Sequence, residues 1–382
     1  ILMISYSKQI IDSKEIRAVS KVLKSEYLTQ GPLVKKFEEK ISNYCNSKHA
    51  IAVNSATSGL HIACMTLGIK KNDIVWTSAI SFVASANAAV YCSADIDFLD
   101  ISLEDYNIDI KSLEKKLLVA KRKNKLPKVI IVVHFAGNPC QMKEIYLLKK
   151  KYKFKIIEDA SHALGAGYMN KRIGNCEFSD MCVFSFHPVK SITTAEGGIV
   201  TTNNKKFFND LKLYREHGIN RNFINKKVRP KYYEQIKLGY NYRMNEIEAA
   251  IGIEQLKKLD SFISKRVEIY NLYKSKLKNN LFEYPNISIN SDSSHHLFVI
   301  LLKKNIRKLR DSIFSKLLKK GIGVNIHYMP IYKHSFYKNY TKKNFFLKNS
   351  ERYYNTCISI PIFPTLSKND QNFIIKIINI LK

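Results

Sequence analysis

The stretch Met181–Val200, which reads MCVFSFHPVKSITTAEGGIV, decides the fold that we expect for this chain. Met181–Phe186 is an apolar run, and Ile199–Thr202 is a second run of the β type. Apolar runs of this length, bounded by turn residues, are typical of buried strands. Lys190 then lies on a tight connection between two buried strands, where burial lowers the pKa of its amine and makes it a nucleophile toward aldehydes. The alternative is an ordinary surface lysine, one of 63 Lys and Arg residues.

A second motif lies upstream of this stretch. Lys155–His162 reads KIIEDASH, a short apolar strand that ends in Glu158 and Asp159. An Asp at the carboxyl end of a parallel strand faces the crevice in which α/β proteins bind their ligands. Beside a pyridine ring, its carboxylate would keep the ring nitrogen protonated and make the ring an electron sink. Asp159 alone is equally well explained as a helix N-cap. Together with Lys190 it suggests pyridoxal phosphate.

Strand-like and helix-like segments alternate from Ala50 to Thr202, which predicts right-handed βαβ crossovers and an α/β fold with a mostly parallel central sheet. Besides the strands already described, we expect strands at Ala50–Val53, Asp73–Thr77, Ile96–Asp100 and Val129–Phe135. Leu256–Lys278 predicts a long helix that leads into a smaller α+β unit, in which Gly323–His327 is expected to be a strand. We therefore expect a large domain over residues 1–255, with an N-terminal arm over 1–30, and a small domain over 256–382.

Three further features are candidates for cofactor contacts. Asn54–Gly59 opens a helix whose free N–H groups and dipole favour an anion such as a phosphate, although an ordinary capped helix start is the alternative. Phe82 begins the next helix and could stack on the pyridine ring, although core packing explains a lone Phe as well. His162 could touch the same ring or fill a core position.

Five segments occur along the chain in the order LTQGPLVKKFE, NSATSGLH, IIEDASHALGA, FSFHPVKSITTAEGG and LGYNYRMNEIEAAIG. With them the chain resembles the sugar-nucleotide aminotransferases of the DegT/DnrJ/StrS family from about Tyr6 to its C-terminus. The resemblance implies a fold type I, aspartate-aminotransferase-like protein that is active as a homodimer. Further segments, YSKQIID, VVHFAGN and HYMPIY, are similar to the branch of the family that serves pseudaminic acid biosynthesis.

The resemblance also implies substrates and site residues. L-Glutamate would donate the amino group, and a UDP-linked 4-keto-6-deoxy-N-acetylhexosamine would accept it. Lys190 would hold the cofactor as a Schiff base and serve as the acid/base. The cofactor-binding residues would be Ala56, Thr57, Ser58, Phe82, Asp159, His162, Ser185, Lys190 and, across the dimer interface, Asn241. The substrate-binding residues would be Tyr6, Glu26, Tyr27, Leu28, Thr29, His327, Tyr328, Met329 and Pro330.

The formal net charge of +31 first suggests a nucleic-acid or membrane-surface partner. The lysines are nevertheless scattered through ordinary amphipathic segments, without an RNA-binding or helix-turn-helix signature. We therefore expect no nucleic-acid partner and assign the charge a milder use, the attraction of anionic sugar nucleotides and pyridoxal phosphate. A regulatory or nucleic-acid-binding protein remains the alternative from a different class.

Seven cysteines are scattered without any CxxC pair, which is typical of small buried residues in a reducing compartment rather than of a disulfide frame or a zinc site. We expect no metal. The start lacks a signal peptide and no apolar run is long enough to span a bilayer, so we expect a cytoplasmic protein without a membrane partner.

Two alternatives within the same fold remain open. The first is transamination of another nucleotide-linked 4-keto sugar, such as a perosamine or bacillosamine precursor. The second is a cofactor-dependent dehydratase, in which a His commonly replaces the Schiff-base lysine, so Lys190 argues against it. Asn220–Gln235 is basic and aromatic, is longer than the resemblance leads us to expect, and suggests a surface flap near the site.

Overall fold

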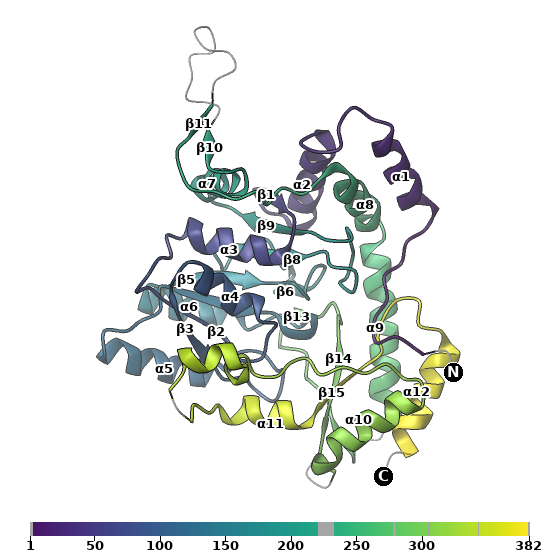
Figure 1. Ribbon diagram of the computed structural model, residues 1–382. Coiled ribbons are helices and arrows are strands. Elements are labelled where there is room, and N and C mark those ends of the chain that lie inside the picture. Colours follow the sequence, from purple (N-terminus) through teal and green to yellow (C-terminus); the bar gives the residue numbers. More distant parts are fainter. Residues whose placement is uncertain (1–2, 221–232, 278–279, 304–305, 343, 381–382) are drawn as a thin grey trace.

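A seven-stranded sheet forms the centre of the protein, with helices on both faces (Figure 1). The computed structural model describes residues 3–220, 233–277, 280–303, 306–342 and 344–380. The strands of this sheet are β1 (His49–Val53), β2 (Ile74–Ser78), β3 (Asp95–Leu99), β4 (Val129–Val133), β5 (Lys155–Asp159), β8 (Met181–Ser185) and β9 (Gly198–Thr202). Their order is β1-β9-β8-β5-β4-β2-β3, and only β9 runs against its neighbours. The predicted mostly parallel α/β sheet is confirmed.

Two layers of helices bury the faces of this sheet. The helices before the linking helix are α1 (Ser13–Leu23), α2 (Pro32–Cys45), α3 (Ala56–Thr66), α4 (Ala84–Tyr91), α5 (Ile110–Arg122), α6 (Met142–Tyr152), α7 (Lys205–Arg215) and α8 (Glu246–Leu256). Apolar side chains of α2, α5, α6 and α8 form one core on one face, and those of α3, α4 and α7 form another core on the opposite face. The strands are buried on both faces, and β4 reads as the continuous apolar run VIIVV for this reason.

A smaller unit follows the long helix α9 (Leu259–Lys276) and has its own core. Its antiparallel sheet has the order β12-β14-β15, with helices packed against it. Its elements are β12 (Phe282–Glu283), β14 (Phe298–Leu302), α10 (Arg310–Lys319), α11 (Lys348–Thr356), β15 (Cys357–Ile360) and α12 (Lys368–Ile380). The remaining short elements are β6 (Gly167–Tyr168), β7 (Lys171–Arg172), β10 (Ile219–Asn220), β11 (Glu234–Gln235), β13 (Ser291–Asp292), η1 (Phe135–Gly137), η2 (Arg307–Leu309), η3 (Ile331–Lys333) and η4 (Ser335–Tyr340).

A buried carboxylate joins the start of α2 to the start of α8. Glu246 is 1% exposed, and its two oxygens accept hydrogen bonds from the amides of Gly31 (3.1 Å), Leu33 (2.7 Å) and Val34 (3.2 Å). These amides belong to the N-terminus of α2, which has no side-chain cap of its own. A negative charge at this place satisfies unpaired N–H groups and favours the helix dipole. The chain before α2 is thereby fastened to α8.

Three local predictions need correction. Gly323–His327 is not a strand, because only Asn325 forms a β-bridge there, with Ser359, and the backbone then turns away. The helix expected to begin at Ile80 begins at Ala84 instead. The helix expected over 256–278 begins at Leu259, after a break behind α8. Most of the predicted flap, residues 221–232, lies outside the described residues.

Two surveys of the described residues bear on ligands and location. None of the helices in these ranges is long and apolar enough to cross a membrane. The same ranges contain no cluster of three or more His, Cys, Asp or Glu side chains suited to a metal ion. All seven cysteines are free thiols, and all but Cys92 are buried.

Candidate active site

A cavity of about 800 Å³ lies beyond the carboxyl ends of β4, β5 and β8, where an open α/β sheet binds its ligand. Its walls come from five main parts of the chain: these strand ends, the start of α3, the segment 81–84 that leads into α4, the connection between β8 and β9, and the turn at 325–329. Tyr6 of the N-terminal arm also lines it. Segments that are far apart in sequence thus meet at one place.

Lys190 lies in the connection between β8 and β9, and its side chain lines the cavity. Its own amide donates a hydrogen bond to His187 O over 2.9 Å, which keeps this connection tight. Burial lowers the pKa of Lys190 from 10.5 to about 8, against the opposing effect of the Asp159 carboxylate. A sizeable fraction of this amine is therefore uncharged near neutral pH and able to act as a nucleophile.

Asp159 ends β5 and is held at both carboxylate oxygens. Ser85 Oγ donates to Oδ2 over 2.6 Å, whereas Ser161 donates to Oδ1 from its hydroxyl (2.6 Å) and its amide (3.1 Å). Ser81 Oγ lies 2.7 Å from Ser85 Oγ and extends this hydrogen-bonded chain. Asp159 is only 5% exposed and lines the cavity. Three donated hydrogen bonds favour its ionised form.

The start of α3 presents main-chain donors to the cavity. Ser55 caps the helix by accepting from Ser58 N (3.1 Å), and Gly59 N donates to Ser55 O (3.1 Å). The amides of Ala56 and Thr57 precede these bonds, so they are among the donors that a helix leaves free at its N-terminus. A Cβ on Gly198 would lie 2.5 Å from Ala56 N, so only glycine lets β9 approach so closely. This arrangement suits a phosphate.

Aromatic rings form the opposite wall. Phe82 lines the cavity and is 59% exposed, so a large part of its ring is free to contact a ligand. Its centroid lies 6.2 Å from that of Tyr328. Tyr6 and His327 also line this wall, with centroids 5.5 Å apart. Such rings suit a planar or sugar-like ligand.

Two of the histidines that line the cavity, His162 and His327, are neutral. His162 Nδ1 accepts from Ala136 N (3.3 Å), so the proton lies on Nε2, which donates to the Tyr328 hydroxyl (3.3 Å). Burial, aided by Lys190 and His327, holds the pKa of His162 well below its usual value. Burial likewise lowers the pKa of His327 to about 3. Neither imidazole therefore adds a positive charge beside the lysine.

Most of the site residues expected from the sequence come together in this cavity. Those that line it are Tyr6, Ala56, Thr57, Phe82, Asp159, His162, Ser185, Lys190, His327, Tyr328 and Met329. Those that do not line it are Glu26, Tyr27, Leu28, Thr29, Ser58, Asn241 and Pro330. Ser58 and Pro330 are buried behind the wall, whereas Tyr27, Leu28 and Asn241 are exposed elsewhere on the same chain.

Sequence reasoning missed several polar residues of the site. Ser81 and Ser161 line the cavity, and Ser85 holds Asp159 from α4 without lining the cavity itself. Ser161 follows Asp159 by two residues, which is the spacing at which an Asp side chain accepts a hydrogen bond from the backbone. This spacing could have identified Ser161 from the sequence. His187 is exposed and lines the cavity as well. Ser85 carries no sequence signal, since its partner is 74 residues away.

The residues present fit pyridoxal phosphate. The free amine of Lys190 suits its aldehyde, and the ionised Asp159 carboxylate suits a protonated ring nitrogen. The amides at the start of α3 suit its phosphate, and the exposed face of Phe82 suits its ring. The fold and this constellation define the class: a pyridoxal-phosphate-dependent aminotransferase of fold type I.

Comparison with known proteins then gives the family. The model of the DegT/DnrJ/EryC1/StrS aminotransferase family matches residues 9–379, and the chain belongs to this family. The chain is 44% identical over 373 residues to the UDP-4-amino-4,6-dideoxy-N-acetyl-beta-L-altrosamine transaminase of Campylobacter jejuni, which covers 97% of this chain and 96% of that relative. The Helicobacter pylori protein of the same name is 36% identical, over 95% of this chain and 93% of its own length.

Solved structures agree with this assignment. Helicobacter pylori PseC, described as an aminotransferase involved in the biosynthesis of pseudoaminic acid, superposes with a TM-score of 0.89 at 34% identity and covers 98% of both chains. The pyridoxal phosphate form of the sugar aminotransferase Spr1654 of Streptococcus pneumoniae gives a TM-score of 0.89 at 26% identity, over 99% of this chain and 98% of that one. Pyridoxal phosphate is thus the cofactor of this protein.

Proposed function

We propose that the protein transfers an amino group from L-glutamate to the C4 keto group of a UDP-linked 4-keto-6-deoxy-N-acetylhexosamine. The product would be UDP-4-amino-4,6-dideoxy-N-acetyl-beta-L-altrosamine, for pseudaminic acid biosynthesis. The names of the Campylobacter and Helicobacter relatives support this substrate. The observation that carries the chemistry is the meeting of a lysine amine of lowered pKa and a fixed carboxylate, Lys190 and Asp159, in one cavity.

Each of these side chains has a distinct role in the proposed reaction. When bound, pyridoxal phosphate supplies an electron sink for the carbon from which a proton is removed. Asp159 orients the ring and keeps a proton on its nitrogen. Lys190 Nζ holds the aldehyde at rest, and when released it takes a proton from glutamate and later delivers one to C4 of the sugar.

The wall opposite the sheet would receive the sugar nucleotide. His327 and Tyr328 present a neutral imidazole and a phenol hydroxyl, which hydrogen-bond to sugar hydroxyls without competing for the charge of the cofactor. The formal charge of +31 attracts the anionic diphosphate to the protein as a whole. Met329 and Tyr6 complete the contact surface.

We also propose that two copies of the chain share their active sites. Asn241 is exposed and does not line the cavity of its own chain, which suits a role at the cofactor phosphate of a partner. Tyr27 and Leu28 are each at least half exposed, as a substrate loop that serves a second subunit would be. In this proposal residues 1–255 and 256–382 act as large and small domains, in a reducing, cytoplasmic setting that suits seven free thiols.

The first experiment is an absorbance spectrum of the purified protein with pyridoxal phosphate, before and after addition of L-glutamate. We expect a visible band that glutamate removes, and a Lys190→Ala variant that forms no such stable band. A panel of UDP-, GDP- and dTDP-linked 4-keto sugars then identifies the acceptor. Absence of the band at saturating cofactor would refute the cofactor chemistry, and turnover of only a GDP or dTDP sugar would refute the proposed acceptor.

Mixed dimers test the shared site. Lys190→Ala and Asn241→Asp are each expected to be nearly inactive, the second because a carboxylate repels the cofactor phosphate. After the two variants are mixed and allowed to exchange subunits, about one quarter of the wild-type activity should return, since half of the dimers then hold one intact site. No recovery in a mixture shown to contain heterodimers would mean that Asn241 acts within its own chain.

A further inference from the structure

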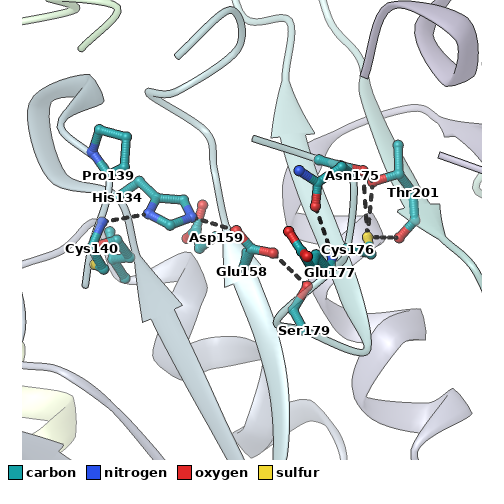
Figure 2. A network of polar contacts seen from close by, with 12 residues as sticks. His134, Pro139, Cys140, Glu158, Asp159, Asn175, Cys176, Glu177, Ser179 and Thr201 are labelled. Atoms are coloured by element: carbon teal, nitrogen blue, oxygen red, sulfur yellow. Dashed lines mark hydrogen bonds and ion pairs between the residues drawn. The ribbon is translucent and has the colours of Figure 1, made fainter. Parts of the chain in front are cut away.

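The reverse face of β5 carries a second carboxylate beside Asp159. Glu158 precedes Asp159 in the strand, so the two side chains leave opposite faces of the sheet. Asp159 faces the cavity. Glu158 faces the layer of helices on the opposite side of the sheet and is 4% exposed (Figure 2). The proposed reaction gives Glu158 no role, although a buried charge is costly unless something in the structure requires it.

Hydrogen bonds occupy both carboxylate oxygens of Glu158. Cys140 N donates to His134 Nδ1 over 3.0 Å, so the proton of this imidazole lies on Nε2. Nε2 donates to Glu158 Oε2 over 2.7 Å, and the hydroxyl of Ser179 donates to Oε1, as Figure 2 shows. Both carboxylate oxygens therefore accept hydrogen bonds, which is the pattern of a charged carboxylate.

No cation neutralises this charge directly. Within the described ranges, no Lys or Arg side chain forms an ion pair with Glu158, and His134 is its single ionisable partner. The nearby thiols are neutral: burial, aided by the carboxylate of Glu158, raises the pKa of Cys176 to about 12. Burial and Glu158 act in the same direction on Cys182.

The same hydrogen-bond network also holds the main chain at Asp159. His134 N donates to Asp159 O over 3.1 Å while its side chain holds Glu158, so one residue after β4 fixes two residues of β5. Ser179 reaches Glu158 from the segment before β8. Three adjacent strands are therefore tied together on the side of the sheet away from the cavity, at the level of Asp159.

We propose that Glu158, held by His134 and Ser179, is a positioning residue that fixes Asp159 and strengthens the negative potential on the cofactor ring nitrogen and on Lys190. This inference rests on the proposed function. A negative charge behind the strand favours every positive charge in the cavity, and the low polarity of the sheet screens this effect less than water would. Removal of the charge should therefore make protonated groups of the site more acidic.

The test substitutes Glu158→Gln, which has nearly the same shape. Its amide oxygen can accept from His134 and its amide nitrogen can donate to Ser179, whose hydroxyl turns to accept. In the holoenzyme we expect the pKa at which the visible cofactor band titrates to fall by about half a unit. We also expect kcat to fall about tenfold, with the KM for the sugar nucleotide within about twofold.

Two further variants separate charge from geometry. Glu177→Gln is the matched control, because Glu177 is exposed and ion-paired with Lys171 at 2.9 Å, and it should leave the titration and kcat unchanged. His134→Gln keeps the charge of Glu158 but replaces the rigid imidazole between Cys140 N and Glu158 Oε2 with a flexible amide, and it should lower kcat without shifting the titration. This second variant also tests the proposal if Glu158→Gln does not fold.

The outcomes distinguish the inference from the function on which it rests. If the wild type shows no band that glutamate removes, the proposed function fails and the inference fails with it. If the wild type transaminates while Glu158→Gln matches it in both titration and kcat, the inference alone is wrong. A loss of kcat in Glu158→Gln without any shift of the titration would reduce Glu158 to a packing role and would also overturn the proposal.

Discussion

The two walls of the cavity are built in different ways. On the sheet side, Asp159 stands at a strand end whose register is fixed by Val133 on one neighbour and Val183 on the other. The facing turn at 325–329 contains no strand: one β-bridge, from Asn325 to Ser359, holds its start, and single side-chain contacts hold the residues that follow. His327 Nδ1 lies 2.8 Å from Ser359 Oγ, and the Tyr353 hydroxyl donates to His327 O. In the proposed function, chemistry lies on this rigid wall, and recognition lies on the wall that can vary with little cost to the fold.

Among the substitutions on the rigid wall, loss of Lys190 should lower activity the most. Without its amine the protein cannot hold the aldehyde or move the proton, so Lys190→Ala should lower kcat/KM by about 10⁴-fold or more. Formation of the amino sugar from glutamate is the measurement. Residual activity within a hundredfold of the wild type would mean that another base lies within reach of the substrate.

The pH dependence of cofactor capture follows the pKa of Lys190. Only the neutral amine reacts, so the capture rate of cofactor-free protein should rise with pH and level off above about 8 instead of near 10.5. Between pH 9 and pH 6 the rate should fall about a hundredfold. Asp159 raises the pKa of Lys190, so Asp159→Asn should move the profile to lower pH. A profile that still climbs at pH 10 would contradict burial as the cause.

A smaller effect is expected from Ser85, which supports the rigid wall from α4. Ser85→Ala removes the 2.6 Å hydrogen bond to Asp159 Oδ2, and the hydrogen bond of a charged group is worth about 1.5–3 kcal/mol. We expect kcat to fall about tenfold with little change in the KM for the sugar. Ser20→Ala, on the exposed face of α1, is the matched control. Equal losses in the two variants would remove Ser85 from the site.

The least effect should come from the facing turn. Tyr328→Phe loses only a 3.3 Å contact with His162 Nε2, near the upper limit of hydrogen-bond lengths, and keeps the ring beside Phe82. We expect about a threefold rise in the KM for the sugar nucleotide, with kcat nearly unchanged. Steady-state kinetics decide this. If Tyr328→Phe lowered kcat more than Ser85→Ala, the proposed division of labour between the two walls would be wrong.

The sequence predicts the rigid wall because the end of a strand has a recognisable local sequence pattern. An apolar run followed by Asp159, and another followed by a turn that bears Lys190, already place both residues at one edge of a parallel sheet. The donor Ser85 leaves no such pattern, because its value lies in a contact across 74 residues. Gly323–His327 looks like a strand from its residues, but whether a strand forms depends on a neighbour that only the folded chain reveals.

Positions on the outer surface are harder still. Glu26–Thr29 and Asn241 lie away from the cavity of their own chain, and periodicity or composition says nothing about a second copy. The formal net charge of +31 shows the same limit. It suggests a nucleic-acid partner, yet the chain belongs to an aminotransferase family. The local sequence pattern predicts where in the fold a residue lies, but it does not predict which residue or molecule that residue contacts.

The carboxylate of Glu246 has a consequence for the order of events on the ribosome. It closes the N-terminus of α2 from a position 215 residues later than Gly31. At synthesis rates of about 5–20 residues per second, the first helices wait roughly 10–40 s for this cap. Edge strand β1 likewise has no partner until β9 emerges. The N-terminal segment is therefore among the first parts to be made and among the last to be secured, which makes it the natural client of a chaperone that binds nascent chains.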